Sequence, residues 1–154
     1  MPKVVTMDEI KALREKTGAG VMDAKKALTE CEGDMKKAEA WIIAKGIQRA
    51  EKKADREAKQ GMIATYSHMG GKIATLVELN CETDFVANTD DFKQLGKELA
   101  MQVASMNPES VEELLKQEYI RDAKVKISDV VKTVGGKVGE NVVVARIARF
   151  AVGE

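Results

Sequence analysis

The chain has 154 residues, of which 44% are apolar, and it carries 25 basic and 25 acidic side chains. This length suits one ordinary domain, or a small domain joined to a larger one. The balanced charge creates no field that would attract nucleic acid or a membrane surface, so we expect neither as a partner.

The N-terminus does not resemble a targeting segment. Met1-Pro2-Lys3-Val4-Val5 lacks the apolar core of a signal peptide, and no apolar run approaches the roughly 18 residues that cross a bilayer. We therefore expect a cytoplasmic protein. Cys31 and Cys81 are too few and too isolated for a disulfide framework or a zinc site, so we interpret them as reduced structural thiols.

The first 46 residues predict a bundle of three short helices. Thr6 and Glu9 form a capping-box pattern, and Gly18 and Gly20 interrupt the first helix. Helical spacing then relates Val21, Ala24, Leu28 and Cys31. A third helix begins after Asp34, places Met35, Ala38, Trp41 and Ile42 on one face, and is expected to end before Gly46.

Residues 47–60 are polar on nearly every side. Five basic residues alternate with Glu51, Asp55 and Glu57, a pattern that favours a solvated helical linker. A nucleic-acid-binding arm is the alternative, but three carboxylates dilute its charge.

From Gly61 the hydrophobic period changes from helical to alternating. Met62, Ala64 and Tyr66 alternate with polar positions, Gly70-Gly71 supplies a turn, and the pattern resumes at Ile73, Thr75, Val77 and Leu79. This predicts a β-hairpin. A third strand is predicted over 142–152, with Val142 and Val144 sharing a face with Phe150 and Val152, and with a bulge or an inward arginine between Arg146 and Arg149.

Helices are predicted between the hairpin and the last strand. Asn88 or Thr89 caps one with an apolar stripe at Phe92, Leu95, Leu99, Val103 and Met106. A weaker helix is expected over 110–118, and another carries Ile127, Val130, Val131, Val134 and Val138 on one face. Residues 61–154 therefore predict an α+β domain, in which helices cover a three-stranded antiparallel sheet.

No pattern in the chain indicates an enzyme, a cofactor or a metal site. His68, the only histidine, is expected in an exposed turn without a second ligand nearby. The glycines at 135, 136 and 139 lack the spacing of a phosphate-binding loop and precede a strand instead of a helix.

Two segments carry apolar side chains that could face a partner. Val21 and Met22 are adjacent, so only one can face the bundle core fully, and Lys25 follows one turn later. Phe85 lies on the connection between the predicted hairpin and the next helix. For both segments the residues alone leave open whether these side chains are core or contact residues.

Three segments together resemble the signatures of bacterial elongation factor Ts, and we identify the chain as a short form of that family. They are Thr83-Asp84-Phe85-Val86, the stretch LREKTGAGVMDAKKAL over 13–28, and the C-terminal GENVVVARIARFAVGE. The resemblance implies a ubiquitin-associated (UBA)-like bundle over 1–46, a linker over 47–60 and an exchange domain over 61–154. It also implies that the chain binds the GTPase elongation factor Tu and promotes release of its GDP. Thr83 to Val86 would form the contact that displaces nucleotide and Mg²⁺, while Arg14, Val21, Met22 and Lys25 would form a second contact.

Longer relatives carry additional structure between the helix that ends near Met106 and the last strand, where this chain has only residues 107–141. Relatives without a second β-subdomain can pair two copies, and the last strand is long, apolar and without proline. We therefore expect a non-covalent homodimer through the core sheet, although Arg146 and Arg149 could keep this edge apart. The alternatives for function are a translation-associated RNA-binding module and an adaptor that binds ubiquitin-like proteins.

Overall fold

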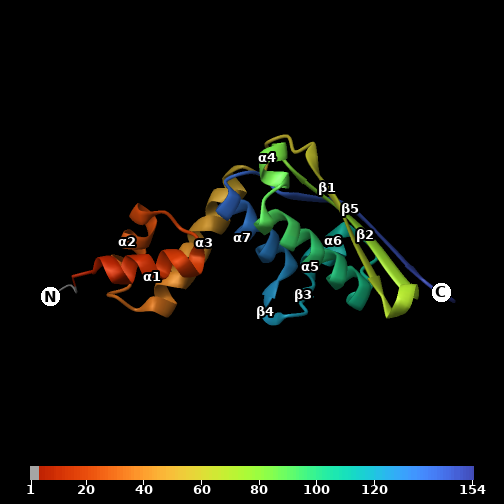
Figure 1. Ribbon diagram of the computed structural model, residues 1–154, viewed down its shortest axis with the longest axis horizontal. Coiled ribbons are helices and arrows are strands. Elements are labelled where there is room, and N and C mark those ends of the chain that lie inside the picture. Colours follow the sequence, from red (N-terminus) through yellow and green to blue (C-terminus); the bar gives the residue numbers. More distant parts are fainter. Residues whose placement is uncertain (1–3) are drawn as a thin grey trace.

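The computed structural model describes residues 4–154, which form two hydrophobic cores joined by a long helix (Figure 1). The smaller core lies within a bundle of α1 (Met7–Thr17), α2 (Val21–Glu30) and the first half of α3 (Met35–Lys52). The larger core lies between a three-stranded sheet and the helices that cover it. The α+β class predicted from the sequence is confirmed.

The helix ends of the bundle follow the sequence signals. Thr6 is the N-cap of α1 and accepts a hydrogen bond from the Glu9 amide, and Asp34 caps α3 in the same way through the Lys37 amide. Gly18 ends α1 in the left-handed conformation, with φ of 74°. The buried side chains are small and aliphatic, which lets three short helices pack closely: Ile10, Leu13, Ala24, Ala27, Leu28 and Ala38.

The third helix does not end before Gly46, as the sequence had suggested, but continues to Lys52. Gly46 is retained inside the helix because α3 crosses α7 (Ile127–Val138) at this point, backbone against backbone. A Cβ built on Gly136 would lie only 2.6 Å from the Cα of Gly46. Ala50 is buried near Gly135 at the next turn of the same crossing. The glycines that weaken each helix by about 1 kcal/mol relative to alanine thus allow the two helices to approach closely.

The segment 47–60 is helical only as far as Lys52, so the expectation of a helical linker is wrong for its second half. Backbone carbonyls beyond that point are bound by side chains of the larger domain. The amide of Asn141 donates to the carbonyls of Ala54 and Arg56, at 3.3 and 2.7 Å. In addition, Lys53 Nζ donates to the Gly139 carbonyl at 2.9 Å. These bonds fix the connection against the core in an irregular path.

The hairpin strands β1 (Gln60–His68) and β2 (Ile73–Cys81) pair antiparallel, and β5 (Val143–Ala151) pairs with the other side of β2. The order is β1-β2-β5, so β1 and β5 are the edges. Ala64, Thr75, Val77 and Leu79 face the helices and are buried, as the alternation predicted. Gly70 and Gly71 adopt positive φ in the turn between the strands, which glycine tolerates without steric cost.

A bulge in β5 changes which side chains face the core. Val144 pairs with Leu79 and Arg146 pairs with Glu78, which leaves Ala145 as the extra residue. The bulge thus precedes Arg146 and does not lie between Arg146 and Arg149, so of the two predicted alternatives the inward arginine, Arg149, is the one confirmed. The predicted shared face is wrong. Val144 is buried whereas Phe150 points to the open face and is 77% exposed. Arg149 lies on the helix side, where it donates to the Ala104 carbonyl at 3.2 Å.

The helices α5 (Asp90–Met106) and α6 (Val111–Lys116) cover one face of the sheet, and α7 packs between α3 and α5 (Figure 1). Thr89 caps α5, and its predicted stripe is buried from Phe92 to Val103, whereas Met106 at the last turn is exposed. The sequence analysis missed a small hairpin of β3 (Glu118–Tyr119) and β4 (Asp122–Lys126).

This small hairpin is held to α5 by polar side chains instead of an apolar face, which explains why hydrophobic periodicity did not reveal it. Glu98 accepts hydrogen bonds from Tyr119 and Arg121, and Gln102 bonds the backbone of residues 118 and 120. Both Glu98 and Gln102 are buried in the middle of α5.

Candidate functional site

The segment Thr83–Val86 forms a single helical turn at the end of β2. This turn, α4 (Asp84–Ala87), begins at Thr83, whose hydroxyl accepts a hydrogen bond from the Val86 amide at 3.3 Å. Val86 and Ala87 are buried against the sheet and α5, so they anchor the turn. Phe85 points the other way, and its side chain is 83% exposed.

The orientation of Phe85 resolves an alternative that the sequence left open, because a core phenylalanine would be buried. Exposure of a large aromatic side chain on a turn that is otherwise anchored leaves about its full apolar area, roughly 150 Å² or more, available to a partner. Asp84 is also exposed and lies in the first turn of α4 beside Phe85. The segment thus presents an apolar wedge next to a carboxylate.

The N-terminal candidates lie at the start of α2 and on α1. Neither apolar residue of the Val21–Met22 pair enters the core: Val21 is 42% exposed and Met22 78%. Lys25 lies one turn further along and is exposed as well. Arg14 has a structural contact, since its Nε donates to the Ala19 carbonyl at 3.2 Å and so holds the turn that precedes α2.

The structure does not bring the two candidate groups together. The α2 group belongs to the bundle and the α4 group stands above the end of the sheet, displaced from the bundle along the long axis of the molecule (Figure 1). A partner that touched both would have to span the connection between the two cores.

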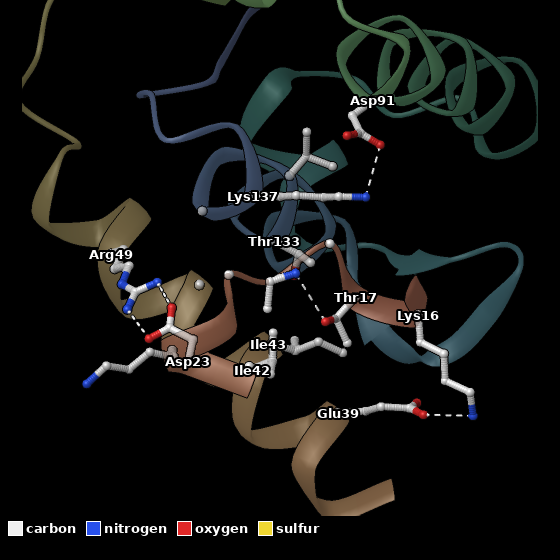
Figure 2. A pocket seen from close by; sticks show the side chains of 17 residues that line it. Lys16, Thr17, Asp23, Glu39, Ile42, Ile43, Arg49, Asp91, Thr133 and Lys137 are labelled. Carbon is white, nitrogen blue, oxygen red and sulfur yellow. Dashed lines mark hydrogen bonds and ion pairs between the residues drawn. The ribbon is translucent and has the colours of Figure 1, made fainter. Parts of the chain in front are cut away.

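A groove of about 420 Å³ opens between the bundle and α7 (Figure 2). Its charged side chains pair with one another: Asp23 binds Arg49 in a bidentate ion pair, Lys16 binds Glu39, and Lys137 binds Asp91. The Arg49 guanidinium holds the pKa of Asp23 below its usual value, despite the opposing effect of burial. Of the seven charged side chains among the described residues that line the groove, six are thus paired within the chain, and the seventh, Lys45, lies over the Trp41 ring. Apolar side chains line much of the rest of the groove between the two cores.

The sequence did not reveal the residues that fix the start of α4 by hydrogen bonds. Glu140 and Asn141, which follow α7, bond to residues 82 and 83 at the start of the turn. The pairs lie more than fifty positions apart in the chain, so no local pattern could connect them. The one available signal was the Gly-Glu-Asn at 139–141, which opens the C-terminal family signature.

The other residues that could carry chemistry have structural surroundings that account for them. Cys81 is fully buried beside α4, and burial raises the pKa of its thiol, an effect that the neighbouring Glu140 carboxylate reinforces. His68 is exposed at the end of β1 and bonds Tyr66 through Nδ1. Residues 135–138 form the last turn of α7, and Gly139 is its C-cap. Among residues 4–154, no cluster of three His, Cys, Asp or Glu side chains could hold a metal ion.

No helix in the described part of the chain is both long and apolar enough to cross a membrane.

Comparison with known proteins connects these features to one family. The family model described as elongation factor TS matches residues 82–154, which include α4 and the last strand. The elongation factor Ts of Herpetosiphon aurantiacus is 39% identical over 194 aligned positions, covering 97% of this chain and 98% of the relative. That of Thermoanaerobacter sp. is 39% identical over 196 positions, covering 98% and 96%.

The relatives also differ from this chain in length. Both alignments are longer than the 154 residues of this chain, so the relatives have segments that it lacks. A longer relative, the elongation factor Ts of Nostoc sp., is 49% identical over 143 positions, which cover 93% of this chain but 45% of the relative. The short form inferred from the sequence is thus confirmed, and the chain belongs to the elongation factor Ts family of translation elongation factors.

Proposed function

We propose that the protein is a guanine-nucleotide exchange factor that binds elongation factor Tu and promotes release of its GDP. The observation that carries this proposal is the outward orientation of Phe85 on the anchored turn α4. Membership of the elongation factor Ts family supports it. Phe85 would wedge between two helices of the GTPase, and Asp84 would act near its Mg²⁺-binding region.

The mechanism requires no covalent chemistry by this chain. A partner that prefers the GTPase conformation with a disrupted nucleotide site weakens GDP binding, and GDP weakens binding of that partner by the same factor. GTP then replaces GDP by mass action. The free energy comes from contacts of the Asp84–Phe85 pair that only the disrupted conformation permits.

We propose that the N-terminal bundle supplies affinity while α4 supplies exchange. In this division, residues 1–46 form a binding module, residues 61–154 form the exchange module, and residues 47–60 connect them. An exposed corner at the start of α2 combines two apolar side chains with one basic side chain: Val21, Met22 and Lys25. Such a corner offers both apolar area and charge to a partner. Arg14 supports this corner from behind through the Ala19 carbonyl.

The direct test measures release of a fluorescent GDP analogue from elongation factor Tu as a function of protein concentration. The proposal predicts that release accelerates with concentration and then saturates. A release rate that stays at the uncatalysed value at every concentration would contradict it.

The basic segment 47–60 argues against the RNA-binding alternative, because four of its five cations are used inside the chain. Arg49 pairs with Asp23, and Arg56 lies 3.7 Å from Glu82. Lys59 pairs with Glu57, and Lys53 is bound to a backbone carbonyl. An RNA-binding surface would present such cations to phosphates instead.

We also propose a homodimer through the core sheet, formed at the edge strand β5 and the open face beside it. Ile63, Leu76 and Phe150 are exposed on the face opposite the helices, with Ala74 and Ala148 beside them. Arg149 turns to the helix side, and Arg146 stays on the open face, where Glu78 neutralises its charge. Cys81 is buried and Cys31 lies at the end of α2 in the bundle, so neither would crosslink this sheet and the dimer would resist reducing agents. Light scattering at micromolar concentration should give twice the monomer mass for the wild type and the monomer mass for Phe150→Asp. A monomeric wild type would refute the dimer.

A further inference from the structure

The carboxylate of Glu140 lies beneath the start of α4 and accepts three hydrogen bonds from it. Oε1 accepts from the amides of Glu82 and Thr83, at 3.1 and 3.0 Å, and Oε2 accepts from the Thr83 hydroxyl at 2.7 Å. Both carboxylate oxygens are therefore used, and hydrogen bonds to a charged acceptor are the stronger kind.

These bonds act on a helix that is too short to be stable alone. A single turn of four residues gains few internal hydrogen bonds for the backbone angles that it fixes. Thr83 links the Glu140 carboxylate to α4, because its hydroxyl donates to Glu140 and accepts from the Val86 amide. The Glu140 carboxylate thus fixes the residue that in turn sets the first turn of α4, on which Phe85 projects.

The neighbouring residues extend the same attachment. The backbone N–H of Asn141 donates to Glu82 Oε1 at 2.8 Å, so residues 140–141 and 82–83 bond each other reciprocally. Asn141 also binds the carbonyls of Ala54 and Arg56 in the connection from the bundle. Residues 140–141, which follow α7, therefore bond both the start of α4 and the connection between the bundle and β1.

We propose that Glu140 is a positioning residue for nucleotide exchange: it holds Thr83, and through it α4, in the orientation that presents Asp84 and Phe85 to the GTPase. Glu140 touches neither the nucleotide nor the partner in this account. The inference rests on the proposed exchange function and adds to it a residue whose effect passes entirely through α4.

The test compares Glu140→Ala, Glu140→Gln and a matched control in the GDP-release titration. Alanine removes all three acceptor bonds, whereas glutamine keeps an oxygen for the two amides and loses the acceptor for the Thr83 hydroxyl. We expect the maximal release rate to fall about tenfold for alanine and less for glutamine, because the aligned loop is then a minor conformation. The half-saturating concentration, set mainly by the N-terminal corner, should change less than about threefold.

Glu113→Ala is the matched control, because Glu113 also accepts a backbone hydrogen bond beside a short helix, from the Glu109 amide at 3.0 Å. It lies at α6, away from the loop, and should leave the rate unchanged. Hydrogen exchange at the Glu82 and Thr83 amides should accelerate in Glu140→Ala, a readout that does not depend on the GTPase.

Adding Glu140→Ala to the double variant Asp84→Ala/Phe85→Ala separates positioning from a direct role. If Glu140 acts through Asp84 and Phe85, the triple variant should be no slower than the double variant. Losses that multiply, or an alanine variant as fast as wild type while Phe85→Ala is slow, would overturn the positioning role and leave the proposed function intact. A wild-type chain that does not accelerate release would refute the proposed function itself, whereas the hydrogen-exchange result would still report on the loop.

Discussion

Replacing Phe85 by alanine should separate the stability of the chain from its activity. The side chain is 83% exposed, so its removal takes little apolar surface out of the folded core. We expect the free energy of unfolding to change by less than about 0.5 kcal/mol, as for other surface substitutions. For a domain of this size, that corresponds to a shift in Tm of roughly 2 °C at most.

The same substitution should greatly reduce exchange. Full burial of a phenylalanine side chain on binding contributes about 2 kcal/mol, and a central aromatic wedge can contribute more. A loss of this size lowers the rate of GDP release at a fixed, subsaturating protein concentration by about thirtyfold. The assay mixes fluorescent GDP bound to elongation factor Tu with excess unlabelled nucleotide and the variant, and follows the decay of fluorescence.

Phe92 provides the comparison for a core position. It is fully buried in α5, so Phe92→Ala should cost about 3–5 kcal/mol of stability and lower Tm by roughly 10 °C or more. Its activity per folded molecule should stay near that of wild type. A Phe85→Ala variant that loses stability like Phe92→Ala and keeps full activity per folded molecule would refute the wedge.

Three further predictions concern other parts of the chain. Met22→Ala should raise the half-saturating concentration in the release assay several-fold without changing Tm, since this side chain is 78% exposed; an unchanged titration would remove the N-terminal corner from the interface. Gly136→Ala should lower Tm by about 5 °C or more in thermal melts, because the new methyl group would overlap the backbone of Gly46. Burial alone would raise the pKa of Glu98, but hydrogen bonds from Arg121 and Tyr119 outweigh it and hold the pKa below the usual 4.5. Its folded-state pKa is thus the lower one, so Glu98 adds stability above about pH 4.5 that is lost as the pH falls through the folded-state pKa, and Glu98→Gln should flatten the acid side of the Tm–pH profile.

The sequence predicted those elements whose signals are local. Helix caps at Thr6, Asp34 and Thr89 rest on bonds across three residues, and the alternation in the hairpin rests on neighbouring side chains. Such patterns can be read from a single chain because the interacting groups lie close together in it. They led to the correct fold class and to the correct pairing of the two hairpin strands.

The features that the sequence did not predict depend on contacts between distant segments. Gly46 reads as a helix end, yet the crossing with Gly136 retains it within α3. The bulge at Ala145 reverses the faces of the residues that follow, and so exposes Phe150. The sequence left the exposure of Phe85 undecided for the same reason. A side chain beside a strand end can face the core or the solvent, and the packing of Val86 against the core determines which.

We propose that this chain and GDP oppose each other in binding to elongation factor Tu, and that the α4 wedge carries this coupling. The most direct measurement is the affinity of the chain for the nucleotide-free GTPase and for the GDP-bound GTPase, by calorimetry under the same conditions. We expect tighter binding to the nucleotide-free form, by the same factor by which the chain weakens GDP binding. Equal affinity for the two forms would contradict it, because a ligand without preference between two states cannot shift their equilibrium.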